Sequence, residues 1–292
     1  MKALSIQIQR EFWEHRGLWI APLAIAAVML LAAAVFGHVG VNFGSGGRHY
    51  DGPLPPPVAE FMALGWAVPF YLAAAIQASA YLIDCLYAER RDRSILFWRS
   101  MPVTDARTVL VKLLVGLVLV PLAAFALAAA TGVAGGAILV LRNHDVIING
   151  VSVVALWNMA DWLQTQVLLL YGLVAAMLWY APFAAYLLLS SVWARRSPYA
   201  WALLPPVLLV VLEYMVFGTH YVGRIVNGGY SEFLHLAFGL QAGDAAGDSG
   251  RYSLQMLTPG QLLASQRLWW GLAAAVGMVA MAIRLRRYRD DS

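Results

Sequence analysis

Six long apolar stretches are the feature that most constrains the fold of this chain. They cover residues 18–36, 66–86, 109–141, 167–193, 201–217 and 268–283. About 20 mostly apolar residues are needed for a helix to cross a bilayer, and a helix satisfies its own backbone hydrogen bonds there. Charged residues make up 12% of the 292 residues, against about 25% in a soluble domain. The sequence therefore predicts an all-α integral membrane protein, with six spans in a single domain over 1–292.

Prolines and glycines interrupt several of these stretches. The third stretch is too long for one straight span, and we expect Pro121 or Gly135–Gly136 to bend or end it. The fourth contains Pro182, and the fifth contains Pro205–Pro206 and one acidic residue, Glu213. A proline inside a helix removes a hydrogen bond and disturbs the preceding turn.

The basic residues are unevenly distributed between the loops. If both termini are cytoplasmic, 15 of the 20 lysines and arginines fall in cytoplasmic segments or at the inner ends of spans. Cytoplasmic loops carry an excess of positive charge. The sequence thus predicts that both termini face the cytoplasm.

Two segments beside the spans are expected to be helical without crossing the membrane. Residues 1–17 are amphipathic, with apolar residues on two opposite sides. Two interpretations stay open: one side lies on lipid and the other on protein, or the stretch is a plain membrane-surface helix that only orients the first span. The outer segment 218–262 contains YSEFLHLAFGL, which is apolar but too short to span, and we expect a re-entrant or interfacial helix there. The apolar residues of the first segment are Leu4, Ile8 and Phe12 on one side and Ile6 and Trp13 on the other.

The cytoplasmic segment ERRDRSILFWRSMPVTD, residues 89–105, joins the second and third spans. Four consecutive apolar residues at 100° per residue surround a helix completely, so at least some of them must contact protein. Apolar residues within a charged rim are typical of a protein interface. The alternative is that the arginines only set the topology, while the aromatic residues pack on the chain's own helix ends. The candidate docking residues are Glu89, Arg90, Arg91, Asp92, Arg93, Ile95, Leu96, Phe97, Trp98, Arg99, Pro102 and Asp105.

The sequence DCLYAERRDRSILFWRSMPVTDARTVLVK resembles permease subunits of ATP-binding-cassette transporters of the ABC-2 type. The local match is dense over residues 89–105, and over the rest of the chain the resemblance is architectural. In that family the loop after the second span carries a coupling helix that docks on the ATPase. The resemblance therefore implies a coupling helix at Ser94 to Ser100, and residues 1–16 resemble the family's connecting helix.

The resemblance also implies partners and a location. Two copies of a separate ATP-binding subunit would bind ATP and Mg²⁺ and hydrolyse the ATP, and a second permease copy or homologue would complete the complex in the bacterial cytoplasmic (inner) membrane. In agreement, Lys2 and Lys112 are the only lysines, and neither follows the glycine-rich turn of a P-loop. We expect no cofactor or metal in this chain, no catalytic residue and no nucleic-acid partner.

A substrate pathway is expected along aromatic residues of the spans. Phe70, Tyr71, Tyr180 and Phe183 are candidates, with Glu213 as an ionisable group within a span. This lining predicts an amphipathic or hydrophobic cargo that moves outward. Two alternatives remain: a membrane anchor or sensor that recruits a cytoplasmic partner without transport, and an intramembrane enzyme. The enzyme is disfavoured because Asp84 and Glu213, the acidic residues in the spans, are expected near opposite faces.

Overall fold

The structure is a computed structural model. Most of it consists of helices long enough to cross a membrane. It describes residues 2–37, 58–92, 104–144, 147–148, 151–152, 158–194, 196–219, 221–239 and 254–288. The helices are α1 (Lys2–Glu14), α2 (Gly17–Phe36), α3 (Val58–Arg91), α5 (Asp105–Leu114), α6 (Val120–Arg142), α8 (Met159–Trp179), α9 (Ala181–Trp193), α10 (Pro198–Phe217), α11 (Tyr221–Phe238), α12 (Pro259–Ala264) and α13 (Gln266–Tyr288). The π-helix η1 (Val115–Leu119) joins α5 to α6, the 3₁₀ turn η2 is Leu254–Met256, and the strands β1 (Ile147–Ile148) and β2 (Val151–Ser152) form a small antiparallel hairpin.

Within the described residues, six helical runs are long and apolar enough to cross a membrane. They are Gly17–Phe36, Ala63–Arg91, Asp105–Arg142, Met159–Trp179, Pro198–Phe217 and Gln266–Tyr288. The protein is thus a multi-pass membrane protein with an almost entirely helical fold, as the apolar stretches predict. The expected coupling helix at Ser94 to Ser100 lies outside the described residues.

The third span is one continuous helical run, so Pro121 and the glycine pair do not end it. The proline follows η1, and its ring would clash with the carbonyl of Leu117 four residues earlier in a regular α-helix. The wider π turn at Val115–Leu119 accommodates that ring without breaking the helix. Gly135 has a packing role, because a Cβ atom there would clash with the indole of Trp66.

The fourth predicted span, residues 167–193, is wrong as a single helix. The structure has two helices, α8 and α9, which meet at Tyr180 with Pro182 in the first turn of α9. Proline favours the first turn of a helix because its missing N–H needs no partner there. With 13 residues α9 is too short to span, but seven of them are buried against neighbouring helices.

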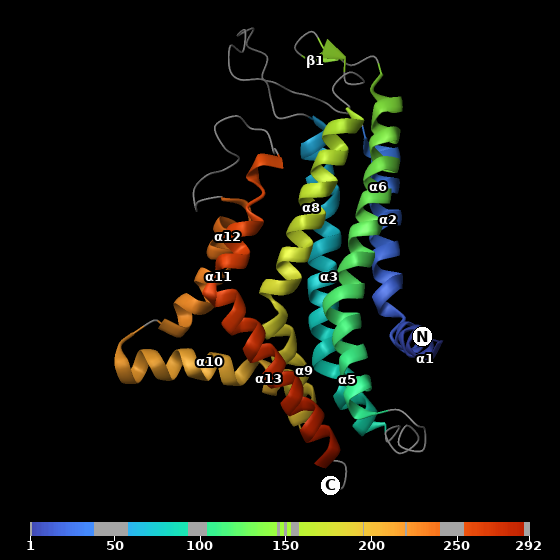
Figure 1. Cartoon of the computed structure of the whole chain (residues 1–292). Helices are drawn as coiled ribbons and strands as arrows, with labels where there is room; N and C mark the ends of the chain where they lie inside the picture. The colour runs from blue at the N-terminus through green and yellow to red at the C-terminus, as the bar shows by residue number, and fades with distance from the viewer. Residues whose placement is uncertain are drawn as a thin grey trace.

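The fifth apolar stretch forms α10, which is mostly exposed, whereas α9 is mostly buried. Figure 1 shows α10 running crosswise to α3, α6 and α8 and pointing away from them. Only Pro198 and Ala202 of its 20 residues are buried. The helix begins where the Ser197 hydroxyl accepts a hydrogen bond from the Ala200 amide, and ends at Gly218 with φ +63°.

The core is centred on α3. Its buried residues recur at helical spacing and pack against α5, α6 and α9. A smaller cluster joins α8 to α11, α12 and α13. The first set on α3 is Ala67, Phe70, Ala74, Leu82 and Leu86, and the second cluster is Ala175, Phe233, Ala237, Leu262 and Leu268.

Candidate functional site

Five charged residues meet where α1, the end of α3, the start of α5 and the end of α13 come together. We call Glu11, Glu89, Asp105, Lys112 and Arg286 the ionic cluster. Lys112 Nζ lies 2.9 Å from Glu11 Oε1 and 3.1 Å from Glu89 Oε1. Arg286 Nη1 lies 2.9 Å from Glu89 Oε2, and its Nε donates to Asp105 Oδ1 at 3.3 Å. Glu89 thus connects the two cations.

Most of the ionic cluster is shielded from solvent. Lys112 is 1% exposed, and Glu11, Glu89 and Arg286 are also buried. Buried charges are tolerated only when they are paired and hydrogen-bonded. The Tyr81 hydroxyl supplies one such bond by donating to Glu11 Oε2 at 2.7 Å, and Arg10 Nη2 approaches Glu89 at 4.0 Å.

His15 borders the ionic cluster at the junction between α1 and α2. Its imidazole meets the Tyr81 ring edge-on, with 4.9 Å between the ring centroids. Burial lowers the pKa of His15 below its ordinary value; Lys112 adds to this effect, while Glu11 and Glu14 oppose it. The imidazole is therefore favoured in its neutral form.

The ionic cluster holds both flanks of the segment that resembles the ABC-2 permeases. Glu89 lies in the last turn of α3, and Asp105 is the first residue of α5. Residues 93–103 between these helices lie outside the described residues. The end of α3 and the start of α5 are thus both tied to α13 through Arg286, while Lys112, near the other end of α5, pairs with Glu11 of α1.

The predicted docking residues divide into three groups. The side chains of Glu89 and Asp105 make ion pairs within this chain, and Arg90 Nη2 donates to the carbonyl oxygens of Ser191 at 2.6 Å and Ala194 at 3.0 Å. Arg91 and Asp92 are exposed and pair with each other at 3.1 Å. The others, Arg93, Ile95, Leu96, Phe97, Trp98, Arg99 and Pro102, lie outside the described residues.

Sequence reasoning missed three members of the ionic cluster, Glu11, Lys112 and Arg286. Lys112 carried the strongest signal, because it is one of two lysines and stands in an otherwise apolar run, VLVKLLVGLV. A charge in such a run needs a partner. That partner cannot be identified from the sequence, because Glu11 lies 101 residues away.

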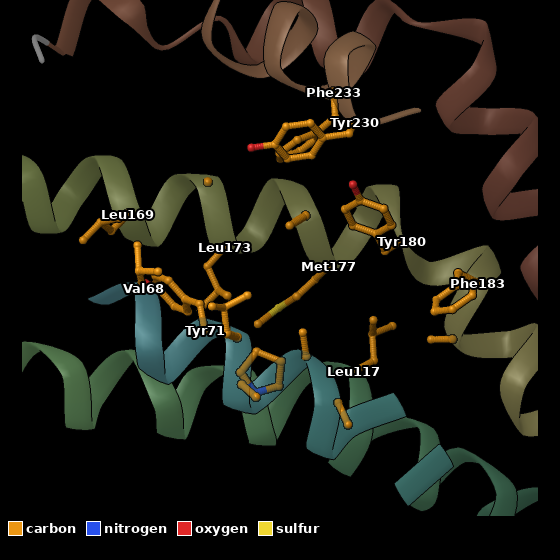
Figure 2. A pocket seen from close by; sticks show the side chains of 18 of the residues that line it. Val68, Tyr71, Leu117, Leu169, Leu173, Met177, Tyr180, Phe183, Tyr230 and Phe233 are labelled. Carbon is orange, nitrogen blue, oxygen red and sulfur yellow. The ribbon is translucent and has the colours of Figure 1, made fainter. Parts of the chain in front are cut away.

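An apolar cavity of about 920 Å³ lies among α3, η1, α8, α9 and α11. In Figure 2, Val68 and Tyr71 of α3 lie on one side and Tyr230 and Phe233 of α11 on the other, with α8 between them in this view. None of the 28 lining residues is charged. The volume falls within the range of about 300–1,000 Å³ typical of small-molecule sites.

The π-helix η1 connects the ionic cluster to the wall of this cavity. Gly116 and Leu117 of η1 line the cavity, and Lys112 lies one helical turn before Gly116. A Cβ atom at Gly116 would lie 2.7 Å from the Leu82 side chain, so this glycine allows close packing on α3. Isolated π turns occur frequently at functional sites.

The predicted pathway residues are only partly brought together. Tyr71, Tyr180 and Phe183 line the cavity. Phe70 is fully buried in the core and does not line the cavity. Successive residues point about 100° apart around a helix, so Phe70 and its neighbour Tyr71 face different surroundings. Glu213 lies on α10, where it accepts a hydrogen bond from Thr219 Oγ1 at 2.9 Å, and does not line the cavity.

Comparison with known proteins found no family model, no curated protein and no solved structure that matches this chain.

Proposed function

We propose that this chain is the permease subunit of an ATP-binding-cassette transporter. It moves an amphipathic or hydrophobic substrate outward, using ATP hydrolysis by a separate subunit docked on residues 89–105. The six membrane-length helices and the apolar cavity support this proposal. The observation that carries it is the ionic cluster, which ties both flanks of the docking segment to α1 and α13.

The ionic cluster makes four helix ends move as one body. Separating one partner of a buried ion pair costs about 3–5 kcal/mol, because a charge is left uncompensated. A displacement of residues 93–103 is therefore passed to α3 and α5 together, and through Glu89 to α13. A loop held by one helix alone would bend locally instead.

The displacement then reaches the cavity along α5. Lys112 is anchored in the ionic cluster, and η1 follows it directly and supplies Gly116 and Leu117 to the cavity wall. The π turn departs from the regular α-helical hydrogen-bond pattern, and such turns occur frequently at functional sites. Motion of the docking segment would thus alter the cavity that holds the substrate.

The arrangement of the helix ends supports cytoplasmic termini. Helix α1 and the last turn of α13 meet at the ionic cluster, and Figure 1 shows both termini towards the lower end of the molecule. That end also bears the arginine-rich segment, which favours the cytoplasmic side. Two ATPase copies, carrying ATP and Mg²⁺, and a second permease copy would complete the complex in the inner membrane.

Co-purification with the ATP-binding subunit tests the docking. The chain would be co-expressed with the ATP-binding protein encoded beside it and isolated in detergent, comparing the wild type with the double variant Phe97→Ala, Trp98→Ala. We expect the ATPase to accompany the wild type and to be lost from the variant. Trp270→Ala is the control, because Trp270 is an exposed tryptophan at the start of α13. If no ATPase accompanied the wild type, the proposal would be overturned.

A second experiment separates docking from coupling. Pro121→Ala removes the ring that disfavours a regular helix at η1, so the segment is expected to revert towards α-helix. We expect the variant to keep its ATPase but lose substrate stimulation of ATP hydrolysis in proteoliposomes. Unchanged stimulation would refute the route through η1 while leaving the docking intact.

A further inference from the structure

The lining of the cavity includes residues that are buried in the core of the bundle. Among them, Ala74, Leu82 and Leu187 are each no more than 3% exposed although they line the space. A hydrocarbon chain suits such a lining, because it has no polar groups that burial would leave without a hydrogen-bond partner.

Part of the cavity's lining is exposed at the surface of the bundle. Its rim includes Val68, Leu72 and Phe183, which are 52%, 60% and 53% exposed. Val68 and Leu72 lie within the membrane-length part of α3, Ala63–Arg91. The surroundings of a span at that depth are lipid hydrocarbon, so a molecule can enter without passing through water.

Among the residues that the structure describes, the lining of the cavity carries no charged side chain. The polar side chains in it are hydroxyl groups, those of Tyr71, Ser79, Thr165, Tyr180 and Tyr230. One of them is already committed, since Thr165 Oγ1 donates to the backbone oxygen of Asp161 at 2.9 Å. A buried ion with no opposite charge nearby is strongly disfavoured.

We propose that this cavity binds an uncharged hydrocarbon chain that enters sideways from the bilayer. The chain is either one tail of a membrane lipid or a free apolar molecule dissolved in the membrane. Its binding to the cavity needs no ATPase; that it is the transported cargo rests on the proposed function. The walls that contact it come from α3, η1, α8, α9 and α11 of a single copy of this chain.

Photolabelling in nanodiscs tests the proposal on the full chain without its ATPase. One sample would contain a phospholipid with a diazirine in its acyl chain, and another a long-chain alcohol with the same diazirine. Labelled peptides would be identified by mass spectrometry. We expect both probes to label the cavity-lining parts of α3 and α8, and an unlabelled long-chain alcohol to compete where a free molecule is the occupant.

Two neighbouring substitutions give a matched pair. Ala75 lines the cavity and is exposed, so Ala75→Trp fills the space from the exposed part of the lining without a clash in the core. Ile76 is the next residue, 69% exposed and not part of the lining, so Ile76→Trp adds a similar ring on a different face. We expect labelling of α8 to fall about tenfold in Ala75→Trp, equivalent to about 1.4 kcal/mol of binding, and to stay at the wild-type level in Ile76→Trp.

The outcomes distinguish a lipid tail from a free apolar molecule, and a failure of the site from a failure of the proposed function. Labelling by the phospholipid alone supports the site with a lipid tail as its occupant, and competition by the free alcohol supports a free apolar molecule. The proposal would be overturned if the cavity residues were not labelled, or if Ala75→Trp and the wild type were labelled equally. It would also be overturned if a second copy of the chain contacted these residues in samples without a diazirine probe. Intact labelling in a chain that co-purifies with no ATPase would overturn the permease function and leave the site standing.

Discussion

The ionic cluster and the contacts of α11 with α8 and α13 hold the cavity from two sides by different means. The ionic cluster anchors α5 and η1 with buried ion pairs. On the other side, the ion pair between Arg267 and Glu232 is more than one-third exposed, and the Trp179 indole donates to the Gly229 carbonyl at 3.1 Å. Buried pairs are lost at a high cost, whereas exposed pairs contribute little.

The two sides of the cavity therefore differ in the kind of contact that holds them, buried ion pairs near η1 and mainly apolar packing at α11. Helix α11 supplies Tyr230, Phe233, Leu234 and Phe238 to the cavity. Its attachment relies on apolar packing, such as the Phe238 ring against Gly172. On the proposed function, we expect substitutions near η1 and substitutions at α11 to have effects of different size.

Among the substitutions that test this difference, Lys112→Met is expected to lower the free energy of unfolding most. It leaves Glu11 and Glu89 buried beside each other without their shared cation, so the free energy of unfolding is expected to fall by about 3–5 kcal/mol. Thermal unfolding in detergent would measure this loss. A control is Arg91→Gln, because Arg91 is exposed two residues after Glu89. Equal stability of Lys112→Met and wild type would refute a structural role for the ionic cluster.

Gly172→Ala would disturb the α11 side. A Cβ atom there would lie 2.8 Å from Phe238 Cζ, so the ring must shift, and a loss of about 1 kcal/mol is expected. Phe238→Leu shortens the ring and is expected to restore stability in the double variant. Unfolding of the wild type, the two single variants and the double variant gives the interaction energy between the two positions. If the effects of the two changes were simply additive, the contact would be contradicted.

Arg267→Met is expected to have a smaller effect. Both partners of its ion pair with Glu232 are partly exposed, so the loss should be below about 1 kcal/mol. The same unfolding assay applies, in low and high salt. A loss as large as that of Lys112→Met would remove the asymmetry between the two walls.

The smallest effect concerns pH. Because the folded state holds the pKa of His15 below its ordinary value, the folded protein binds fewer protons than the unfolded chain. Stability is then complete above about pH 6.5 and decreases as the pH falls from there towards the folded-state pKa. His15→Phe keeps a ring against Tyr81 and should flatten that part of the curve of melting temperature against pH. An unchanged slope in the variant would assign the pH dependence to other groups.

The apolar periodicity was sufficient to predict the class of fold, because a membrane span is a local property of about 20 residues. It could not show that 167–193 breaks at Tyr180, since Pro182 is equally compatible with a kinked helix. Nor could it distinguish α9 from α10, whose similar apolarity accompanies opposite burial. Hydropathy measures the preference for an apolar surrounding and does not say whether that surrounding is protein or lipid.

The site was predictable to a smaller degree. Tyr71, Tyr180 and Phe183 do line the cavity, because aromatic residues of spans commonly face such spaces. Glu89 and Asp105 were identified as important for a docking surface, but the structure places both in the ionic cluster. Their partners, Lys112 and Arg286, are separated from them by up to 197 residues, and long-range pairing of this kind leaves no local pattern.

The ionic cluster also has a consequence for the order of synthesis. Glu11, Glu89, Asp105 and Lys112 all emerge from the ribosome well before Arg286. Until the last helix is made, three carboxylates of the cluster face one of its two cations. Assembly of this end of the described bundle therefore waits for the last helix, which brings the arginine that pairs with Glu89 and Asp105.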